Sequence, residues 1–206
     1  MQVIRIVELD KKKKKIVLEN EECFALYNGE VRKYQLEEGA VVDDLVYQEI
    51  LDQVLIKRAR ERMLYLLKDS DKTERQIREK LETGYYPKTA IEAAVAFGKK
   101  YHYIDDIRYA ENFIRGKGQQ LSRKELEYKL QQRGIGKEMY QSLYEELEED
   151  GTQEDAALER LIQKKNVNFS EITPEEKQKL YAYFIRKGFS YEAVRKKLDE
   201  FESRDT

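Results

Sequence analysis

Two large apolar residues four positions apart, followed by a glycine and a second apolar stripe, recur three times in this chain of 206 residues. The clearest copy is Ser122–Leu147. Leu126 and Leu130 share one face because side chains four residues apart are neighbours on a helix. Gly134 predicts the end of this helix, since glycine readily takes the left-handed conformation that closes many helices. The stripe that follows consists of Ile135, Tyr140, Leu143, Tyr144 and Leu147.

The other two copies have the same parts at similar offsets. The paired apolar residues and their glycines are Ile77, Leu81 and Gly84 in the first copy, and Leu180, Phe184 and Gly188 in the third. The later stripes are Tyr85, Ala90, Ala94 and Phe97, and then Phe189, Val194, Leu198 and Phe201. Each copy opens with the pattern of a capping box, a hydroxyl residue followed three positions later by Glu or Gln. The capping pairs are Thr73 with Gln76, Ser122 with Glu125, and Thr173 with Glu176.

One further helix is expected before each copy, so the repeating unit has three helices. The leading helices are expected at Gln53–Lys68, Asp105–Gly116 and about Asp155–Lys165. A single unit cannot bury its apolar face alone, and stacked neighbours share a core. We therefore predict a mainly α fold with three tandem three-helix repeats in an elongated curved array. Its predicted parts are a connecting helix at 40–52, capped by Asp43, and repeats at 53–101, 102–150 and 151–206.

Residues 1–39 have a different pattern, which predicts a small antiparallel β segment of three or four strands. Val3–Leu9 and Lys15–Glu19 are rich in β-branched residues, which favour strands. Cys23–Tyr27 and Glu30–Tyr34 flank Asn28-Gly29, a sequence typical of a type I′ hairpin turn. The lysine run Lys11–Lys15 is read as a solvated turn that protects a sheet edge, with a nucleic-acid contact as the alternative.

The residues that carry most enzyme chemistry are scarce. Cys23 is the only cysteine and His102 the only histidine, so we expect no internal disulfide, no thiolate metal site and no catalytic imidazole. Asp105 and Asp106 are adjacent and point apart on a helix, so we read Asp105 as a helix cap with Ile104 and Tyr109 as the flanking hydrophobic staple. No glycine-rich phosphate cradle, membrane span or secretion signal is evident. We expect a cytoplasmic protein without cofactor, metal or catalytic residues.

The charge is distributed unevenly, although the formal net value is only −2. Lys57–Lys137 holds 20 basic and 12 acidic residues, an excess of 8, whereas Glu138–Asp155 holds 8 acidic residues and no basic one. The basic half suits phosphate, and the acidic junction suits a basic protein surface. The plainer reading is that long charged helices have solvated faces. If contacts exist, the candidates are Arg58, Arg62, Arg75, Arg78, Lys99, Lys100, Arg115, Lys117, Arg123, Lys124 and Arg133.

Residues 53–201 resemble the RecX family of RecA-recombinase regulators. The resemblance lies in the repeated apolar and glycine pattern, in Tyr103-Ile104-Asp105-Asp106-Ile107-Arg108-Tyr109-Ala110, and in Arg186-Lys187-Gly188-Phe189-Ser190-Tyr191. The residues that match the family's structural signature are Tyr103, Asp105, Asp106, Ala110, Gly84, Gly134 and Gly188. The sequence departs from the pattern at Glu82-Thr83-Gly84, where one residue fewer precedes the glycine, which leaves the local angle of the first repeat open.

The resemblance implies a protein that binds RecA filaments on DNA, and we expect it to be a monomer without enzymatic activity. Strand exchange and RecA-stimulated self-cleavage of repressors would decrease, which places the protein in DNA repair, DNA recombination and the SOS response. Contacts with single- or double-stranded DNA would be independent of sequence. Two alternatives stay open: a DNA-binding helical-repeat protein that acts without RecA, and a helical-repeat adaptor for another protein.

Overall fold

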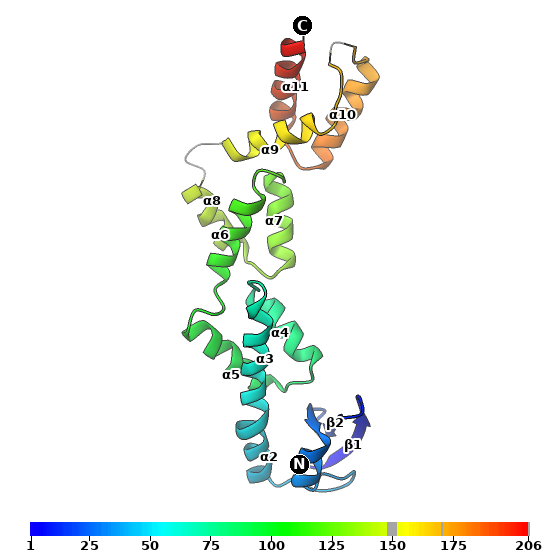
Figure 1. The fold of residues 1–206 in the computed structure, drawn as a ribbon, viewed down its shortest axis with the longest axis vertical. Helices are drawn as coiled ribbons and strands as arrows, with labels where there is room; N and C mark the ends of the chain where they lie inside the picture. The colour runs from blue at the N-terminus through cyan, green and yellow to red at the C-terminus, as the bar shows by residue number, and fades with distance from the viewer. Residues whose placement is uncertain (148–151, 170, 206) are drawn as a thin grey trace. The chain divides into compact units, whose positions relative to one another are not determined.

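The computed structural model describes residues 1–147, 152–169 and 171–205. Two compact units, Met1–Asp105 and Asp106–Thr206, make up the chain. Helices predominate and one small antiparallel sheet lies at the N-terminus, so the predicted mainly α class with an N-terminal β segment is confirmed (Figure 1). The elongated array and the limits of the three repeats stay predictions. The limit between 150 and 151 and part of the acidic junction lie outside the described residues.

The sheet has three antiparallel strands in the order β1-β2-β3. They are β1 (Val3–Glu8), β2 (Lys13–Leu18) and β3 (Cys23–Tyr27). The predicted hairpin at Asn28-Gly29 is wrong, because these residues begin helix α1 (Asn28–Lys33). The Glu30 side chain accepts from the Tyr27 amide at 2.8 Å, which closes a helix start where the turn was expected. The lysine run is only partly a turn. The Asp10 carboxylate accepts a hydrogen bond from the Lys12 amide at 2.7 Å within the turn, whereas Lys13 already belongs to β2.

The first unit is built on one long helical segment that runs without a break from Asp44 to Lys68. It consists of α2 (Asp44–Ile50), a π-helical turn η1 (Leu51–Leu55) and α3 (Ile56–Lys68). The Asp43 cap is confirmed, since its side chain accepts from the Leu45 amide at 2.8 Å. However, the connecting helix joins the first repeat instead of ending before it. Helices α4 (Glu74–Thr83) and α5 (Lys88–Lys100) both pack against α3.

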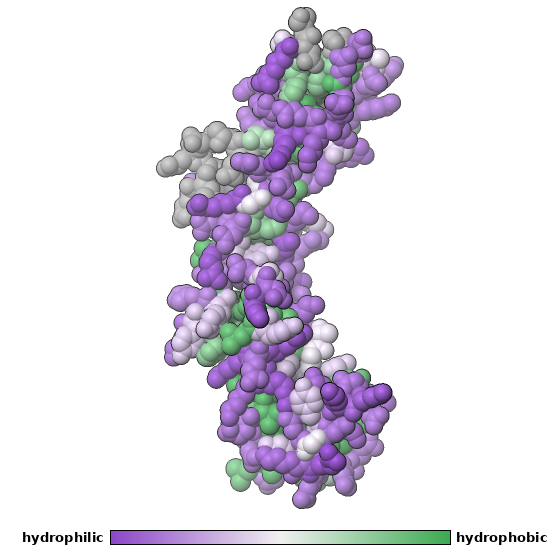
Figure 2. All heavy atoms as spheres, viewed as in Figure 1, coloured by the Kyte–Doolittle hydropathy of each residue, from purple (hydrophilic) through white to green (hydrophobic). Residues whose placement is uncertain are grey.

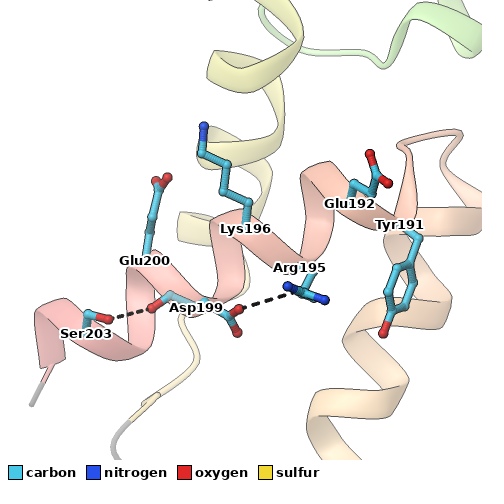
Figure 3. A pocket seen from close by; sticks show the side chains of 7 residues that line it. All are labelled: Tyr191, Glu192, Arg195, Lys196, Asp199, Glu200 and Ser203. Carbon is cyan, nitrogen blue, oxygen red and sulfur yellow. Dashed lines mark hydrogen bonds and ion pairs between the residues drawn. The ribbon is translucent and has the colours of Figure 1, made fainter.

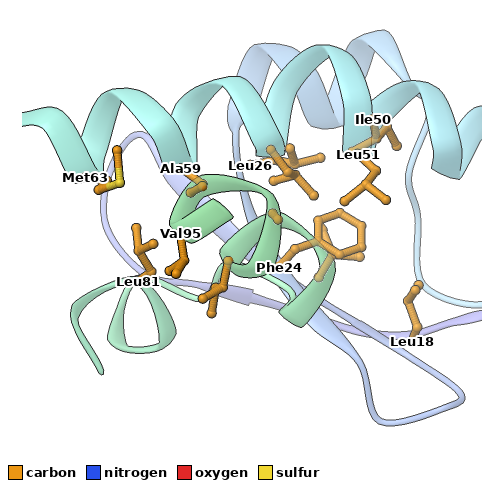
Figure 4. Close-up of a cluster of buried hydrophobic side chains, with 14 of the residues drawn as sticks. Leu18, Phe24, Leu26, Ile50, Leu51, Ala59, Met63, Leu81 and Val95 are labelled. Atoms are coloured by element: carbon orange, nitrogen blue, oxygen red, sulfur yellow. The ribbon is translucent and has the colours of Figure 1, made fainter. Parts of the chain in front are cut away.

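One hydrophobic core joins the sheet to these helices. Figure 4 shows Phe24 and Leu26 of β3 gathered with Ile50 and Leu51 beneath the long helical segment. On the long helical segment, Leu55, Ala59 and Met63 are buried, and Leu66 and Leu67 are partly buried against the same core. The β segment therefore folds as part of the same core as the first repeat.

The second unit contains helices in two groups of three, each with its own core. The first group is α6 (Asp106–Lys117), α7 (Arg123–Gln132) and α8 (Lys137–Leu147). The second is α9 (Thr152–Gln163), α10 (Pro174–Arg186) and α11 (Tyr191–Asp205). The buried residues include those predicted at Leu126, Leu130, Ile135, Tyr140, Leu143 and Tyr144, and at Phe184, Phe189, Val194 and Leu198. The side chain of Leu147 lies outside the described residues.

The turn after the paired apolar residues has the same geometry in all three copies. This geometry corrects the predicted alignment of the first copy with the other two. Gly134 and Gly188 have φ angles of 87° and 99°, but Gly84 lies outside the left-handed region and Tyr85 has φ 58°. The Tyr85 amide donates to Glu82 O at 2.9 Å, as Gly188 donates to Ile185 O at 2.9 Å. These are the bonds of a Schellman closure. Tyr85, not Gly84, is therefore the counterpart of Gly134, and the first turn is not shortened.

Two hydrogen bonds show what covers these turns. At the first turn, the Ala25 amide of β3 donates to Tyr85 O at 3.2 Å, so the sheet covers it. At the third turn, the Ser122 hydroxyl at the start of α7 donates to Lys187 O. The N-caps at Thr73, Ser122 and Thr173 are confirmed. The reciprocal bond predicted from Glu125 is wrong, because its carboxylate accepts instead from Lys187 Nζ at 2.9 Å.

Candidate functional site

A groove of about 730 Å³ lies in the first unit, between the sheet and helices α3 and α4. We call it the basic–tyrosine groove, and its lining consists of Lys13, Arg58, Arg62, Lys80, Tyr27, Tyr65, Tyr86, Glu61, Thr83 and Gly84. Four of these residues are basic, three are tyrosines and one is acidic. The groove thus gathers cations and aromatic rings from separate elements.

Helix α3 supplies one wall because its sequence holds two stripes. Arg58, Glu61, Arg62 and Tyr65 recur at spacings of three and four residues, so they share one face. The buried stripe of α3, which includes Ala59, lies beside this face. Burial of the apolar stripe therefore holds the polar one toward the groove.

The cations of the groove differ in their partners. Arg58 pairs with Glu30 and lies 4.6 Å from the centre of the Tyr27 ring, so it fixes the β segment to α3. Its side chain and that of Glu30 are only 22% and 23% exposed, which makes this pair part of the fold. Within residues 1–147, 152–169 and 171–205, no carboxylate pairs with Lys13, Arg62 or Lys80. These three remain available to an anionic ligand.

Tyrosine rings lie beside the cations. The Lys13 ammonium is 4.9 Å from the Tyr27 ring centre, and the Arg62 guanidinium is 5.3 Å from that of Tyr65. Tyr65 is 62% exposed, so its ring can receive a flat partner. Burial raises the pKa of Tyr86, although Arg58 and Arg62 act in the opposite direction, so its hydroxyl stays protonated at neutral pH.

Two other predicted contact residues of the first unit, Arg78 and Lys99, form an internal network instead. Arg78 binds both carboxylate oxygens of Glu92, at 2.7 and 2.9 Å, and also Glu74 at 2.8 Å. Lys99 pairs with the same Glu74. Burial alone would raise the pKa of Glu74, but hydrogen bonds from Lys99 and Arg78 lower it below its ordinary value. Arg78 and Lys99 thus tie α4 to α5.

The remaining predicted contacts are spread over other helices. Arg75 pairs with Glu79 at 2.8 Å, and the Lys100 ammonium lies 5.6 Å from the Tyr101 ring centre. In the second unit, Arg115 pairs with Glu111 at 2.7 Å, and Arg123 pairs with Glu127 at 3.0 Å. Three further residues contact neighbours that are not acidic; these are Lys117 with Gln120, Lys124 with the Gly188 turn, and Arg133 over the Phe113 ring. Only Arg58 and Arg62 of the predicted set line the basic–tyrosine groove.

A second hollow lies along α11 and has a different character. Figure 3 shows its lining, in which Arg195 and Lys196 alternate with Glu192, Asp199 and Glu200. Arg195 already pairs with Asp199 at 4.0 Å. A surface of one helix with both signs of charge shows no preference for an anionic or cationic ligand.

Sequence reasoning missed the groove residues that come from other elements. Lys13 belongs to the lysine run, for which a nucleic-acid contact was only the alternative reading. No pattern in the local sequence joins Lys13 and Lys80 to Arg62, because the three residues come from separate elements. Among the described residues, no group of three or more His, Cys, Asp or Glu side chains could hold a metal ion. In the same ranges, no helix is long and apolar enough to cross a membrane. Hydrophilic residues cover most of the face in view in Figure 2.

Comparison with known families and proteins gives one consistent result. Residues 105–142 match the profile described as RecX, second three-helix domain, and residues 153–198 match RecX, third three-helix domain. A protein of Clostridium beijerinckii named Regulatory protein RecX is 27% identical over 196 residues, which cover 94% of this chain and 92% of that protein. Its namesake from Caldanaerobacter subterraneus is 28% identical over 201 residues, 97% of this chain and 99% of the other.

Two solved structures share the fold. One, described as the crystal structure of regulatory protein RecX, has a TM-score of 0.64 at 20% identity and covers 96% of this chain and 98% of its own. The other, RecX from Lactobacillus salivarius, has a TM-score of 0.61 at 18% identity and covers 70% of this chain and 95% of its own.

Proposed function

Because this chain belongs to the RecX family of non-enzymatic regulatory proteins, we propose that it binds RecA filaments on DNA and inhibits their recombinase and coprotease activities. The observation that carries the proposal is the similarity to proteins named Regulatory protein RecX over nearly the whole chain. The protein would act in the cytoplasm as a monomer. The helical repeats would supply a binding surface, and catalytic groups would not be needed.

The exposed cations of the repeats support a partner that carries negative charge. A RecA filament on DNA offers phosphate as well as protein surface, and basic side chains can position a protein on phosphate without reading sequence. The candidates for these contacts are the eleven basic residues predicted above. Those with an internal carboxylate partner, such as Arg78, would contribute less, since binding would require them to exchange one ion pair for another.

The test is an assay of RecA-driven strand exchange with this protein added at substoichiometric and near-stoichiometric levels. We expect strand exchange to decrease, together with DNA-dependent ATP hydrolysis by RecA and RecA-stimulated cleavage of a repressor. Adding the protein before and after filament formation separates blocked assembly from an effect on finished filaments. Unchanged exchange and hydrolysis at near-stoichiometric protein would refute the proposal.

A second candidate function is DNA binding without RecA, and the basic–tyrosine groove favours it. In that case the protein would bind an oligonucleotide alone and would leave RecA activity unchanged beyond simple competition for DNA. Raising the DNA concentration would then abolish any inhibition, whereas inhibition through the filament would persist.

A further inference from the structure

We propose that the basic–tyrosine groove is a binding site for single-stranded nucleic acid, to which the N-terminal β segment contributes one wall. Lys13, Arg62 and Lys80 would hold the sugar–phosphate backbone, and Tyr65 would stack on a base. This proposal rests on the second candidate function, DNA binding without RecA, and assigns that binding to a site; it does not depend on the proposed regulation of RecA.

The first argument is the origin of the cations. Lys13 comes from β2, Arg62 from α3 and Lys80 from α4, and all three line one hollow. None of the three pairs with a carboxylate among the described residues, and an anion bound between like charges reduces their mutual repulsion. Among the described lining residues, Glu61 is the only acidic one. Glu30, which lies outside the lining, pairs with Arg58. The groove therefore keeps an excess of positive charge.

The second argument is the position of the tyrosines. Proteins that bind single strands without sequence preference combine a basic groove with aromatic rings on which bases stack. Tyr65 is 62% exposed beside the unpaired Arg62, so a phosphate and the adjoining base could be bound together. A duplex keeps its bases stacked on each other, and stacking on Tyr65 therefore favours an unpaired strand.

The third argument is what the lining lacks. The groove contains no Leu, Ile, Val or Met side chain among its described lining residues. A groove that receives an amphipathic helix of a protein partner offers an apolar surface to the hydrophobic face of that helix. An acidic peptide would find the cations here but no aliphatic pocket. Nucleic acid uses both of the features that are present.

The Arg58–Glu30 pair explains how the site is kept in shape. It joins α3 to the start of α1, directly after Tyr27 of β3. The Glu30 carboxylate also accepts from the Tyr27 amide at 2.8 Å, so one residue fixes the strand end and the helix together. This contact holds Lys13 and Tyr27 opposite Arg62 and Lys80. The β segment thus has a role in binding besides covering the first repeat.

The experiment measures binding of the full chain, without RecA, to a fluorescent oligothymidylate of about 20 nucleotides by anisotropy, at salt from about 25 to 200 mM. We expect Arg62→Ala and Lys80→Ala each to weaken binding and to reduce the slope of log affinity against log salt by about 0.7. Tyr65→Ala should weaken binding about 5-fold or more, and Tyr65→Phe should restore it because the ring face is retained.

The matched control is Lys57→Ala, which removes one positive charge from the same helix outside the groove. Circular dichroism confirms that each variant is folded. The site is refuted if Arg62→Ala and Lys80→Ala change the affinity no more than Lys57→Ala does. Equal binding of duplex that is insensitive to Tyr65→Ala would also overturn it, as would binding of a polyglutamate peptide in preference to the oligonucleotide. Since RecA is absent, none of these outcomes bears on the proposed regulation of RecA.

Discussion

Gly188→Ala tests the contact between the start of α7 and the turn that precedes α11. Gly188 has φ +99°, in the left-handed region that favours glycine. A Cβ atom added there would lie 2.7 Å from Ser122 Oγ and 2.8 Å from Lys124 Cβ. Side chains do not approach one another so closely, and the turn or the start of α7 must shift. The hydrogen bond from Ser122 to Lys187 O would be lost or weakened.

The expected loss of stability has two parts. The left-handed backbone costs an alanine about 1–2 kcal/mol. Relief of the overlap with Ser122 and Lys124 adds about 1–3 kcal/mol, the usual range for overpacking. We therefore expect the free energy of unfolding to fall by about 2–5 kcal/mol.

Gly39→Ala is a matched control, because Gly39 also has a left-handed φ of +85° but a Cβ there meets nothing within 4 Å. It should cost only the backbone part, about 1–2 kcal/mol. Urea denaturation followed by circular dichroism gives both values, and hydrogen exchange locates the loss. For Gly188→Ala, hydrogen exchange should accelerate at the Glu125 amide, because this amide donates a hydrogen bond to Ser122 Oγ at 3.2 Å and Ser122 would shift. Equal costs for the two variants, with unchanged exchange at Glu125, would refute the contact.

Three further predictions concern caps and ion pairs. Ser122→Ala should cost about 1–2 kcal/mol in urea denaturation, more than Thr173→Ala, because it removes both a helix cap and the donor to Lys187 O; equal costs would contradict this. Glu30→Ala should cost about 1–3 kcal/mol and accelerate hydrogen exchange in β3, whereas unchanged exchange would contradict its role as an anchor. The stabilisation from Glu74 is fully present above its ordinary pKa of 4.5 and is lost as pH falls through the lowered folded value. Glu74→Gln should therefore lose less stability than the wild type between about pH 6 and pH 3, and equal losses would contradict the network.

In the first repeat, a tyrosine takes the left-handed turn conformation that glycine takes in the other two repeats. The turn closes four residues after the second apolar residue in every copy, at Tyr85, Gly134 and Gly188. A tyrosine in this conformation is unfavourable by about 1–2 kcal/mol. The surrounding contacts offset it, since Tyr85 O accepts from Ala25 and the Lys15 ammonium lies 4.5 Å from the ring centre. Apolar spacing, not the glycine, sets the register of the repeat.

The candidate site was only partly predictable. Arg58 and Arg62 were predicted because they share a face of α3 next to the buried stripe, which is a local property of the sequence. Lys13 and Lys80 lie far from them along the chain and reach the groove only through packing of β2 and α4 on α3. Arg78 was predicted as a contact for the same local reason, yet in the folded chain its guanidinium binds Glu74 and Glu92.

The sequence by itself determined the helical repeats, their N-caps and their buried stripes, because all of these depend on residues a few positions apart. Leu126, Leu130 and the cap at Ser122 follow directly from helical spacing and hydrogen-bonding side chains. Only the tertiary structure decided that Asn28-Gly29 begins a helix, that Glu125 turns to Lys187, and which cations stay unpaired. Each outcome involves a charged group that is distant in the chain: Arg58 binds Glu30 at the start of α1 from 28 positions away, and Lys187 binds Glu125 from 62 positions away. The local sequence does not determine which charged groups meet across a packed interface.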